Sequence, residues 1–230
     1  MKVSTIIPVY NGAKYLAATL ESALAQTRPV DEFIVIDDGS TDSSPEILKS
    51  YGDRLTVIRQ HNQGVAAARN VGLRHATGEL ITFLDQDDLW PADRTQLLVD
   101  VLQATPGALV AAGLVEILYE RPNPPTPLDN FGIAHREFYV GSLCARKQLF
   151  DLLGPFHTGL GYADDLDFML RRREAKIKTA YLDDVTLQYR LHDSNTSINR
   201  NVTNAHFMAA LRESLRRRRK EEGKQRDGRS

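Results

Sequence analysis

The chain has 230 residues, of which 42% are hydrophobic, enough for one large domain or two small ones with a sizeable core. Its formal net charge is −1, but residues 216–230 hold eight Lys or Arg and three acids, a local charge of +5 that leaves −6 on residues 1–215. An acidic body of this kind is not suited to gripping nucleic acid by its phosphates, so no nucleic-acid partner is expected. The single Cys144 excludes an internal disulfide framework and is expected to be a buried thiol.

Neither a leader segment nor a membrane-spanning segment is expected. The strand pattern begins at Val3 without a basic and apolar leader, and no apolar run approaches the length of a transmembrane segment. We therefore expect a cytoplasmic protein. The basic tail, residues 216–230, is expected to be frayed or disordered, with peripheral contact to an anionic membrane surface as the alternative.

The first half of the chain alternates short β-branched, apolar runs with patterns of helical spacing. Strands are predicted over residues 3–9, 33–36, 55–58 and 80–84. Helices are predicted from about residue 14, from Ser44 as the capping residue, over residues 65–76 and after Pro91. This alternation predicts an α/β sandwich with a mostly parallel sheet.

The second half is less regular. Strands are predicted over residues 108–118 and 138–145 and in TAYL and VTLQYRL, with helices ending at Leu153 and covering about residues 164–173. The stretch ERPNPPTPLDN holds four prolines and is predicted to be a loop outside the sheet. A last helix is predicted from about Asn201, packing Phe207, Leu211 and Leu215 against the body.

The strand over residues 80–84 stops at Asp85, Gln86, Asp87 and Asp88. Carboxylates this close repel one another and are costly beside an apolar core unless a positive group joins them. A hard divalent cation with oxygen ligands would supply that charge, at the sheet edge where open parallel sheets bind ligands. The competing interpretation, solvated carboxylates that precede a helix, is equally consistent with this stretch alone.

A second acidic strand end lies at Asp37 and Asp38, and the turn after Pro8 would lie on the same edge of the sheet. One crevice would therefore collect carboxylates from separate elements. A dinucleotide-binding dehydrogenase would use Asp37 or Asp38 to bind a ribose, but it needs a Gly-rich phosphate turn after the first strand, which PVYNGAKYL does not form. A sugar-phosphate nucleotidyltransferase needs several glycines and basic residues there, so both alternatives are disfavoured. A phosphatase would need a nucleophilic Asp in the same place, where the chain has Val9, Tyr10 and Asn11.

Several segments, taken in order, resemble family 2 glycosyltransferases with the GT-A fold. They are PVYN, VIDDGSTD, GVAAARNVG, FLDQDDLW and GYADDLDFMLR, within residues 3–192. The resemblance implies a Rossmann-like, mostly parallel sheet flanked by helices. It also implies one domain over residues 1–200, with a nucleotide-binding half (about 1–105) and an acceptor half (about 106–200), followed by a C-terminal helix and basic tail (201–230).

The function that this resemblance implies is inverting sugar transfer. The donor would be a nucleotide-sugar, expected to be a UDP-sugar, and the acceptor a hydroxyl group on a saccharide, a lipid-linked glycan or a peptide. A divalent ion, Mn²⁺ or Mg²⁺, is implied as cofactor. The alternative is a non-catalytic nucleotide-sugar-binding module of the same fold, which the presence of both Asp87 and Asp165 disfavours.

The resemblance also implies roles for residues that would hold the nucleotide. Pro8, Val9 and Tyr10 would contact uracil or ribose, and Asp38 would accept a hydrogen bond from the base. For Pro8 and Val9 plain strand packing is the alternative, and for Asp38 a turn residue. Arg69 would approach the donor phosphates or be an exposed surface arginine.

The stretch Asp85-Gln86-Asp87 matches the DxD position of the family. Asp87 would ligate the metal ion, Asp85 would contact ribose or metal-bound water, and Gln86 would belong to the donor site. His192 matches a position from which a histidine can reach the metal ion or the diphosphate. Asp88 is expected instead to cap the next helix.

Inverting transfer also needs a base that takes the proton of the acceptor hydroxyl. By its position in the pair Asp164-Asp165, where the family has Glu-Asp, Asp165 would be that base. The alternative is that Asp164, Asp165 and Asp167 only favour the positive end of a helix. For Asp167 this alternative is preferred.

Overall fold

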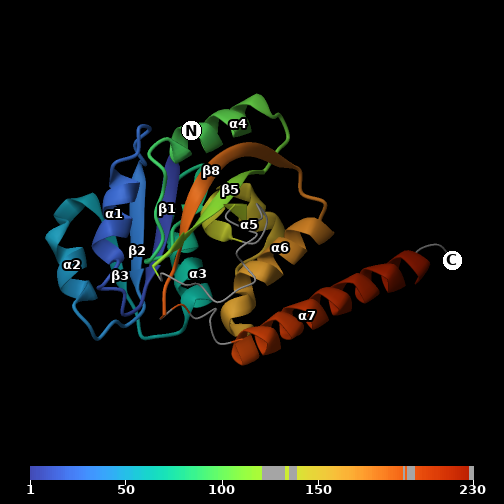
Figure 1. Cartoon of the computed structure of the whole chain (residues 1–230). Coiled ribbons are helices and arrows are strands. Elements are labelled where there is room, and N and C mark those ends of the chain that lie inside the picture. The colour runs from blue at the N-terminus through green and yellow to red at the C-terminus, as the bar shows by residue number, and fades with distance from the viewer. Residues whose placement is uncertain (121–132, 135–138, 194, 196–199, 228–230) are drawn as a thin grey trace.

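The computed structural model describes residues 1–120, 133–134, 139–193, 195 and 200–227 (Figure 1). The strands are β1 (Val3–Val9), β2 (Glu32–Asp37), β3 (Thr56–Arg59), β4 (Leu80–Phe83), β5 (Val110–Tyr119), β6 (Ile133–Ala134), β7 (Leu143–Arg146) and β8 (Thr179–Leu191). The α-helices are α1 (Leu16–Leu24), α2 (Ser44–Ser50), α3 (Val65–His75), α4 (Arg94–Ala104), α5 (Gln148–Leu153), α6 (Asp164–Glu174) and α7 (Arg200–Asp227). Short 3₁₀ turns cover Gly52–Arg54 (η1), Val140–Ser142 (η3) and Gly161–Ala163 (η4).

The strands form one mixed sheet in the order β3-β2-β1-β4-β7-β5-β6, with β8 paired to β5. β1 to β4 are mutually parallel, β7 is antiparallel to both β4 and β5, and β8 is parallel to β5. The predicted α/β fold with a mostly parallel sheet is confirmed. This topology brings the carboxyl ends of β1, β2 and β4 to one edge.

The central strands are apolar because helices cover both faces of the sheet. All seven residues of β1 and all four of β4 are buried. Since successive side chains of a strand point to opposite faces, Ile6 packs in one cluster with Ala68 of α3, and Ile7 packs in another with Leu16 and Leu20 of α1.

The small residues of α3 let this helix lie close to the sheet. A Cβ atom built on Gly72 would come within 2.3 Å of the Cγ2 atom of Ile6. Only glycine leaves room for the side chain of Ile6 at this contact. The height of α3 above β1 therefore depends on a single missing methyl group.

Some predicted elements differ from the structure. The strand predicted over residues 138–145 is replaced by η3 and the shorter β7, and the two strand segments predicted after α6 form one strand, β8. Ser44 does not cap α2: it lies inside the helix, and its Oγ accepts a hydrogen bond of 3.0 Å from the backbone N–H of Gly12. Most of the predicted proline-rich loop lies outside the described residues.

The C-terminal helix also corrects the prediction. α7 continues to Asp227, so residues 216–227 are helical rather than frayed, and Figure 1 shows α7 running past α6 and away from the body. The helix packs on α6 and η4, as predicted, but not through Phe207, Leu211 and Leu215, whose side chains are 42%, 41% and 51% exposed. Among the described residues, no helix combines the length and the apolar character needed to cross a bilayer.

Candidate functional site

Asp38, directly after β2, organises the loop that leads into α3. Its carboxylate accepts hydrogen bonds from Gln60 Nε2 (2.6 Å) and from the backbone N–H groups of Gln63 (2.9 Å) and Gly64 (2.8 Å). The residue is only 3% exposed. Asp38 thus fixes the entry to α3, while its expected contact with a nucleotide base stays a prediction.

Gln86 joins the ends of β1 and β4. Its side-chain amide accepts a hydrogen bond from the N–H of Tyr10 (2.7 Å) and donates one to the carbonyl oxygen of the same residue (3.0 Å). Pro8 and Val9 are buried in β1, whereas Tyr10 is 46% exposed. Of the four residues predicted to contact the nucleoside, Pro8, Val9 and Asp38 are buried, and only Tyr10 has an exposed side chain.

Arg69 on α3 connects the two sides of the candidate site. Its Nη2 donates to both carboxylate oxygens of Asp85 at 2.8 and 3.1 Å, and its Nη1 donates to Asp164 at 2.6 Å and to Asp165. The interpretation of Arg69 as an exposed surface arginine is wrong, because the residue is only 2% exposed. Its predicted contact with donor phosphates stays a prediction.

Asp165 lies in the first turn of α6 and faces this guanidinium. Its second carboxylate oxygen accepts a hydrogen bond of 3.2 Å from the backbone N–H of Val140. Burial raises the pKa of Asp165 to about 7; Arg69 opposes this rise, and the charges of Asp164 and Asp85 add to it. A carboxyl group with such a pKa can exchange a proton near neutral pH.

Asp87 and His192 form the other part of the site. His192 Nε2 lies 3.1 Å from Asp87 Oδ2, and the imidazole stacks on Tyr15 with ring centroids 4.3 Å apart. Burial and the charge of Asp85 raise the pKa of Asp87, while His192 opposes this rise. The Tyr15 hydroxyl donates a hydrogen bond of 2.7 Å to Glu120. The stacking of Tyr15 on His192 was not predicted, because the two residues are far apart in the sequence.

The side chains of Asp87 and His192 fit a divalent metal ion that the phosphates of a bound nucleotide also help to hold. In the part of the chain that the structure describes, no three His, Cys, Asp or Glu side chains gather closely enough to bind a metal ion by themselves. However, carboxylate ligands suit Mn²⁺ and Mg²⁺, histidine is a common metal ligand, and Mg²⁺ commonly binds through one or two carboxylates plus substrate phosphates. Asp87 and His192 supply such a partial set beside Asp85.

The neighbouring acids are structural. Asp88 does not cap α4, which begins at Arg94; instead its carboxylate accepts a hydrogen bond of 3.0 Å from the N–H of Arg190 on β8. Asp167 does more than favour the start of α6, since it pairs with Arg171 Nε (2.8 Å) and Arg217 Nη1 (2.7 Å). These contacts fix β8 and α7 around the site.

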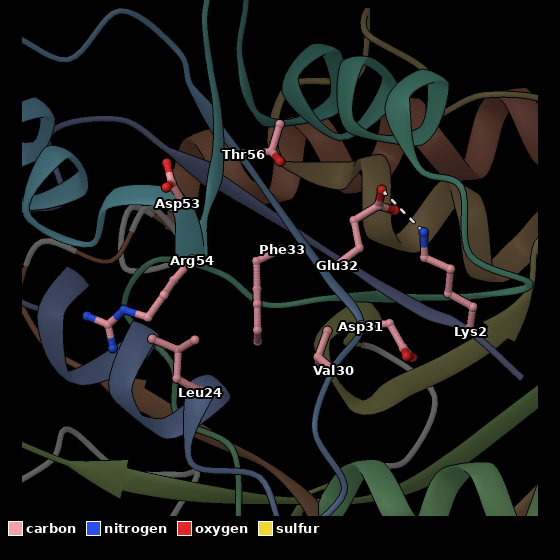
Figure 2. A pocket seen from close by; sticks show the side chains of 9 residues that line it. All are labelled: Lys2, Leu24, Val30, Asp31, Glu32, Phe33, Asp53, Arg54 and Thr56. Carbon is pink, nitrogen blue, oxygen red and sulfur yellow. Dashed lines mark ion pairs between the residues drawn. The ribbon is translucent and has the colours of Figure 1, made fainter.

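A separate pocket lies at the opposite, amino-terminal edge of β1 to β3. Figure 2 shows its lining: Lys2, Leu24, Val30, Asp31, Glu32, Phe33, Asp53, Arg54 and Thr56. Asp31 accepts a hydrogen bond of 2.8 Å from the N–H of Val3, and Glu32 accepts one of 2.9 Å from the N–H of Thr77. None of the residues predicted to bind the nucleotide, the metal ion or the acceptor lines this pocket, so it is not the candidate site.

The model of the family described as "Glycosyl transferase family 2" matches residues 4–166, a stretch that begins in β1 and ends in the first turn of α6. The chain belongs to glycosyl transferase family 2. The match includes Asp85, Asp87 and Asp165, which the fold gathers at one edge of the sheet. The family predicted from the sequence is thus confirmed.

This family 2 member has similar proteins in several bacteria. It is 30% identical over 210 residues to an uncharacterized glycosyltransferase of Rickettsia typhi, covering 85% of this chain and 65% of that protein. It is 42% identical over 100 residues to glycosyltransferase GlyA of Streptococcus pneumoniae, covering 42% of this chain and 14% of GlyA. The chain therefore spans less than two thirds of the length of these relatives.

Two solved structures share the fold of this family 2 member. TarS 1–349 of S. aureus in complex with UDP-GlcNAc matches with a TM-score of 0.73 and 23% identity, over 93% of this chain and 65% of that one. The mannosyltransferase PcManGT of Pyrobaculum calidifontis in complex with GDP-Man and Mn²⁺ matches with a TM-score of 0.70 and 26% identity, over 94% and 64%. The GT-A fold class predicted from the sequence is confirmed.

Proposed function

We propose that this chain transfers a sugar, of hexosyl type, from a nucleoside diphosphate donor to an acceptor hydroxyl with inversion at the anomeric carbon. The observation that carries this proposal is the bridge made by Arg69 between Asp85, at the end of β4, and Asp165, in the first turn of α6. A donor-side carboxylate and a candidate base thereby lie on either side of one guanidinium. The nucleotide-sugars bound to TarS and PcManGT support a donor of this class.

On the donor side, Tyr10 and Asp38 are proposed to bind the nucleoside, a uridine in the preferred case, with Pro8 and Val9 forming the strand beneath them. Asp87 and His192 would hold Mn²⁺ or Mg²⁺, with Asp85 and Gln86 shaping the surrounding edge. When bound, such an ion neutralises the diphosphate oxygens and so makes the nucleoside diphosphate a better leaving group.

On the acceptor side, Asp165 is proposed as the base. The acceptor oxygen bonds to the anomeric carbon as the bond from that carbon to the diphosphate oxygen breaks, and the hydroxyl proton passes to Asp165. Arg69 and the N–H of Val140 each bind the Asp165 carboxylate, so they orient it before the acceptor arrives. The acceptor is a saccharide, a lipid-linked glycan or a peptide hydroxyl, and a cytoplasmic location belongs to this proposal.

The first prediction tests the base. Since the acceptor is unidentified, donor hydrolysis serves as the reaction, with water in the place of the acceptor and UDP-GlcNAc, UDP-glucose and GDP-mannose as donors in the presence of Mn²⁺. Asp165→Asn keeps the shape of the side chain but cannot take a proton, so we expect hydrolysis to fall by about a hundredfold or more while calorimetry shows unchanged donor binding.

The control for this prediction is Asp151→Asn, an exposed acid on α5 that should leave both measurements unchanged. Hydrolysis at the wild-type rate by Asp165→Asn would refute the role of the base. If the unaltered chain binds donors but releases no nucleoside diphosphate from any of them, the alternative of a non-catalytic nucleotide-sugar-binding module is favoured.

A further inference from the structure

One side of helix α7 packs against α6 and η4. Ala210 is fully buried, and Ser214 donates a hydrogen bond to Glu174. Arg217 pairs with Glu174 and Asp167, each at 2.7 Å. These contacts fix which side of the helix faces the protein.

The adjoining side of α7 is apolar and open to solvent. Phe207, Met208, Leu211 and Leu215 are 42%, 50%, 41% and 51% exposed. Their spacing places them on a single stripe of an α-helix, because residues three or four apart lie on the same face. We call these four residues the apolar stripe. A contiguous group of large apolar side chains on a surface marks an interaction site more often than scattered ones do.

Basic side chains border the apolar stripe on the side away from α6. With 3.6 residues per turn, Arg212 and Arg219 fall beside Met208, and Arg216 falls one step further round. All three are exposed, and Arg216 forms an ion pair of 2.6 Å with Glu213. In the sequence, residues 216–230 carry a formal charge of +5.

We propose that α7 is a peripheral membrane-binding helix: the apolar stripe enters the headgroup region of an anionic bilayer, and Arg212, Arg216 and Arg219 contact lipid phosphates. An apolar face bordered by Lys and Arg is the pattern of helices that lie in a membrane interface. Charge decides between a lipid surface and a second copy of this chain. Two copies packed along the apolar stripe would bring their arginines together, whereas anionic lipids neutralise them.

The shape of the molecule agrees with this occupant. α7 lies at the periphery of the molecule, with the body on its α6 side (Figure 1), so the solvent-facing side of the helix can approach a flat surface. α7 also rests on α6, the helix whose first turn holds Asp165. A bilayer bound to α7 would therefore lie on the α6 side of the protein. This inference does not depend on the proposed sugar transfer.

Sedimentation of the full chain with vesicles tests the proposal. We expect the chain to sediment with phosphatidylcholine vesicles that contain phosphatidylglycerol, to bind pure phosphatidylcholine far less, and to be released by high salt. The double variants Leu211→Ser with Leu215→Ser, and Arg212→Gln with Arg219→Gln, should each lower the partition coefficient by about tenfold.

The control is Leu152→Ser, which removes a leucine that is 62% exposed on α5 and should change nothing. All altered side chains are exposed, so unchanged melting temperatures are expected and would show that the fold is intact. The proposal is overturned if the unaltered chain does not bind anionic vesicles or if the α7 variants bind as well as the Leu152 control. It is also overturned if light scattering shows a dimer that the leucine double variant dissociates, with no vesicle binding.

Discussion

Arg69 is the residue on which the electrostatics of the site depend. It is the positive partner of Asp85, Asp164 and Asp165, and these charges hold its own pKa well above the ordinary value despite its burial. A buried cation that satisfies several carboxylates cannot be removed cheaply, because each of them is left unpaired in a poorly solvated place. Arg69 thus stabilises the protein and orients the proposed base at the same time.

Arg69→Met should lower the free energy of unfolding by about 3 kcal/mol at pH 7.5, measured by urea denaturation. The loss should be smaller at pH 5.5. Without the guanidinium, the pKa values of Asp164 and Asp165 in the folded state lie further above their values in the unfolded chain. The loss in the free energy of unfolding is therefore small at a pH where both carboxyl groups are protonated, and it grows as the pH rises.

Arg74→Met removes an exposed arginine from the same helix and is the matched control, for which we expect a change within about 0.5 kcal/mol. An equal loss of stability at both pH values for Arg69→Met would show that the carboxylates are not responsible. No loss at all would contradict the network itself.

At the scale of elements, the position of α3 is decided by its contact with β1. α3 carries Arg69, and its entry is fixed by Asp38, so its distance from the sheet sets where the guanidinium lies. Gly72 allows the close approach by leaving space for Ile6. The smallest residue of the helix therefore positions the most important charge of the site.

Gly72→Ala should destabilise the protein by about 1–3 kcal/mol, although alanine is the better helix former by roughly 1 kcal/mol. The added methyl group would collide with Ile6 and push α3 outward. Combining it with Ile6→Ala, which removes the Cγ1 and Cγ2 atoms that the added methyl group would meet, should cost less stability than the sum of the two single losses. Denaturation of both single variants and of the pair measures this coupling, and strict additivity would contradict the proposed contact.

At the scale of the whole molecule, the site exists because parallel strands end at a common edge. β1, β2 and β4 deliver Tyr10, Asp38 and Asp85 there, and α6 brings Asp165 from the second half of the chain. β8 returns to the same place and presents His192 to Asp87. A ligand that bridges these elements should therefore stabilise the entire fold.

UDP with Mn²⁺ should raise the melting temperature by about 5 °C or more when supplied at a hundred times its dissociation constant. Asp87→Ala should abolish this metal-dependent shift. Asp53→Ala, an exposed acid beside the pocket at the opposite edge of the sheet, should retain it. A full shift with chelator present, or with Asp87→Ala, would show that the nucleotide does not depend on this metal position.

The sequence predicted the sheet-forming runs and the acidic strand ends well because both are local patterns. An apolar β-branched run forms a buried strand whatever its position in the sheet, and the polar residues that follow it lie at the edge where the strand ends. Local patterns fail where the secondary structure of a segment depends on the residues that it contacts in the folded protein. The stretch from Tyr139 to Cys144 reads as strand, but its first part turns as η3 and brings the N–H of Val140 to Asp165.

What the sequence by itself determined was the α/β alternation, the family and the set of acids that gather at one edge. The tertiary structure alone decided which charges meet: Arg69 with Asp164 and Asp165, Asp88 with the backbone of β8, and the side of α7 that faces the protein. Helical spacing identified an apolar stripe on α7, but it did not show whether the stripe faces the body or the solvent. Arg217 pairs with the buried Asp167 and the half-buried Glu174 of α6, and with this side of α7 held against α6 the apolar stripe is left facing solvent.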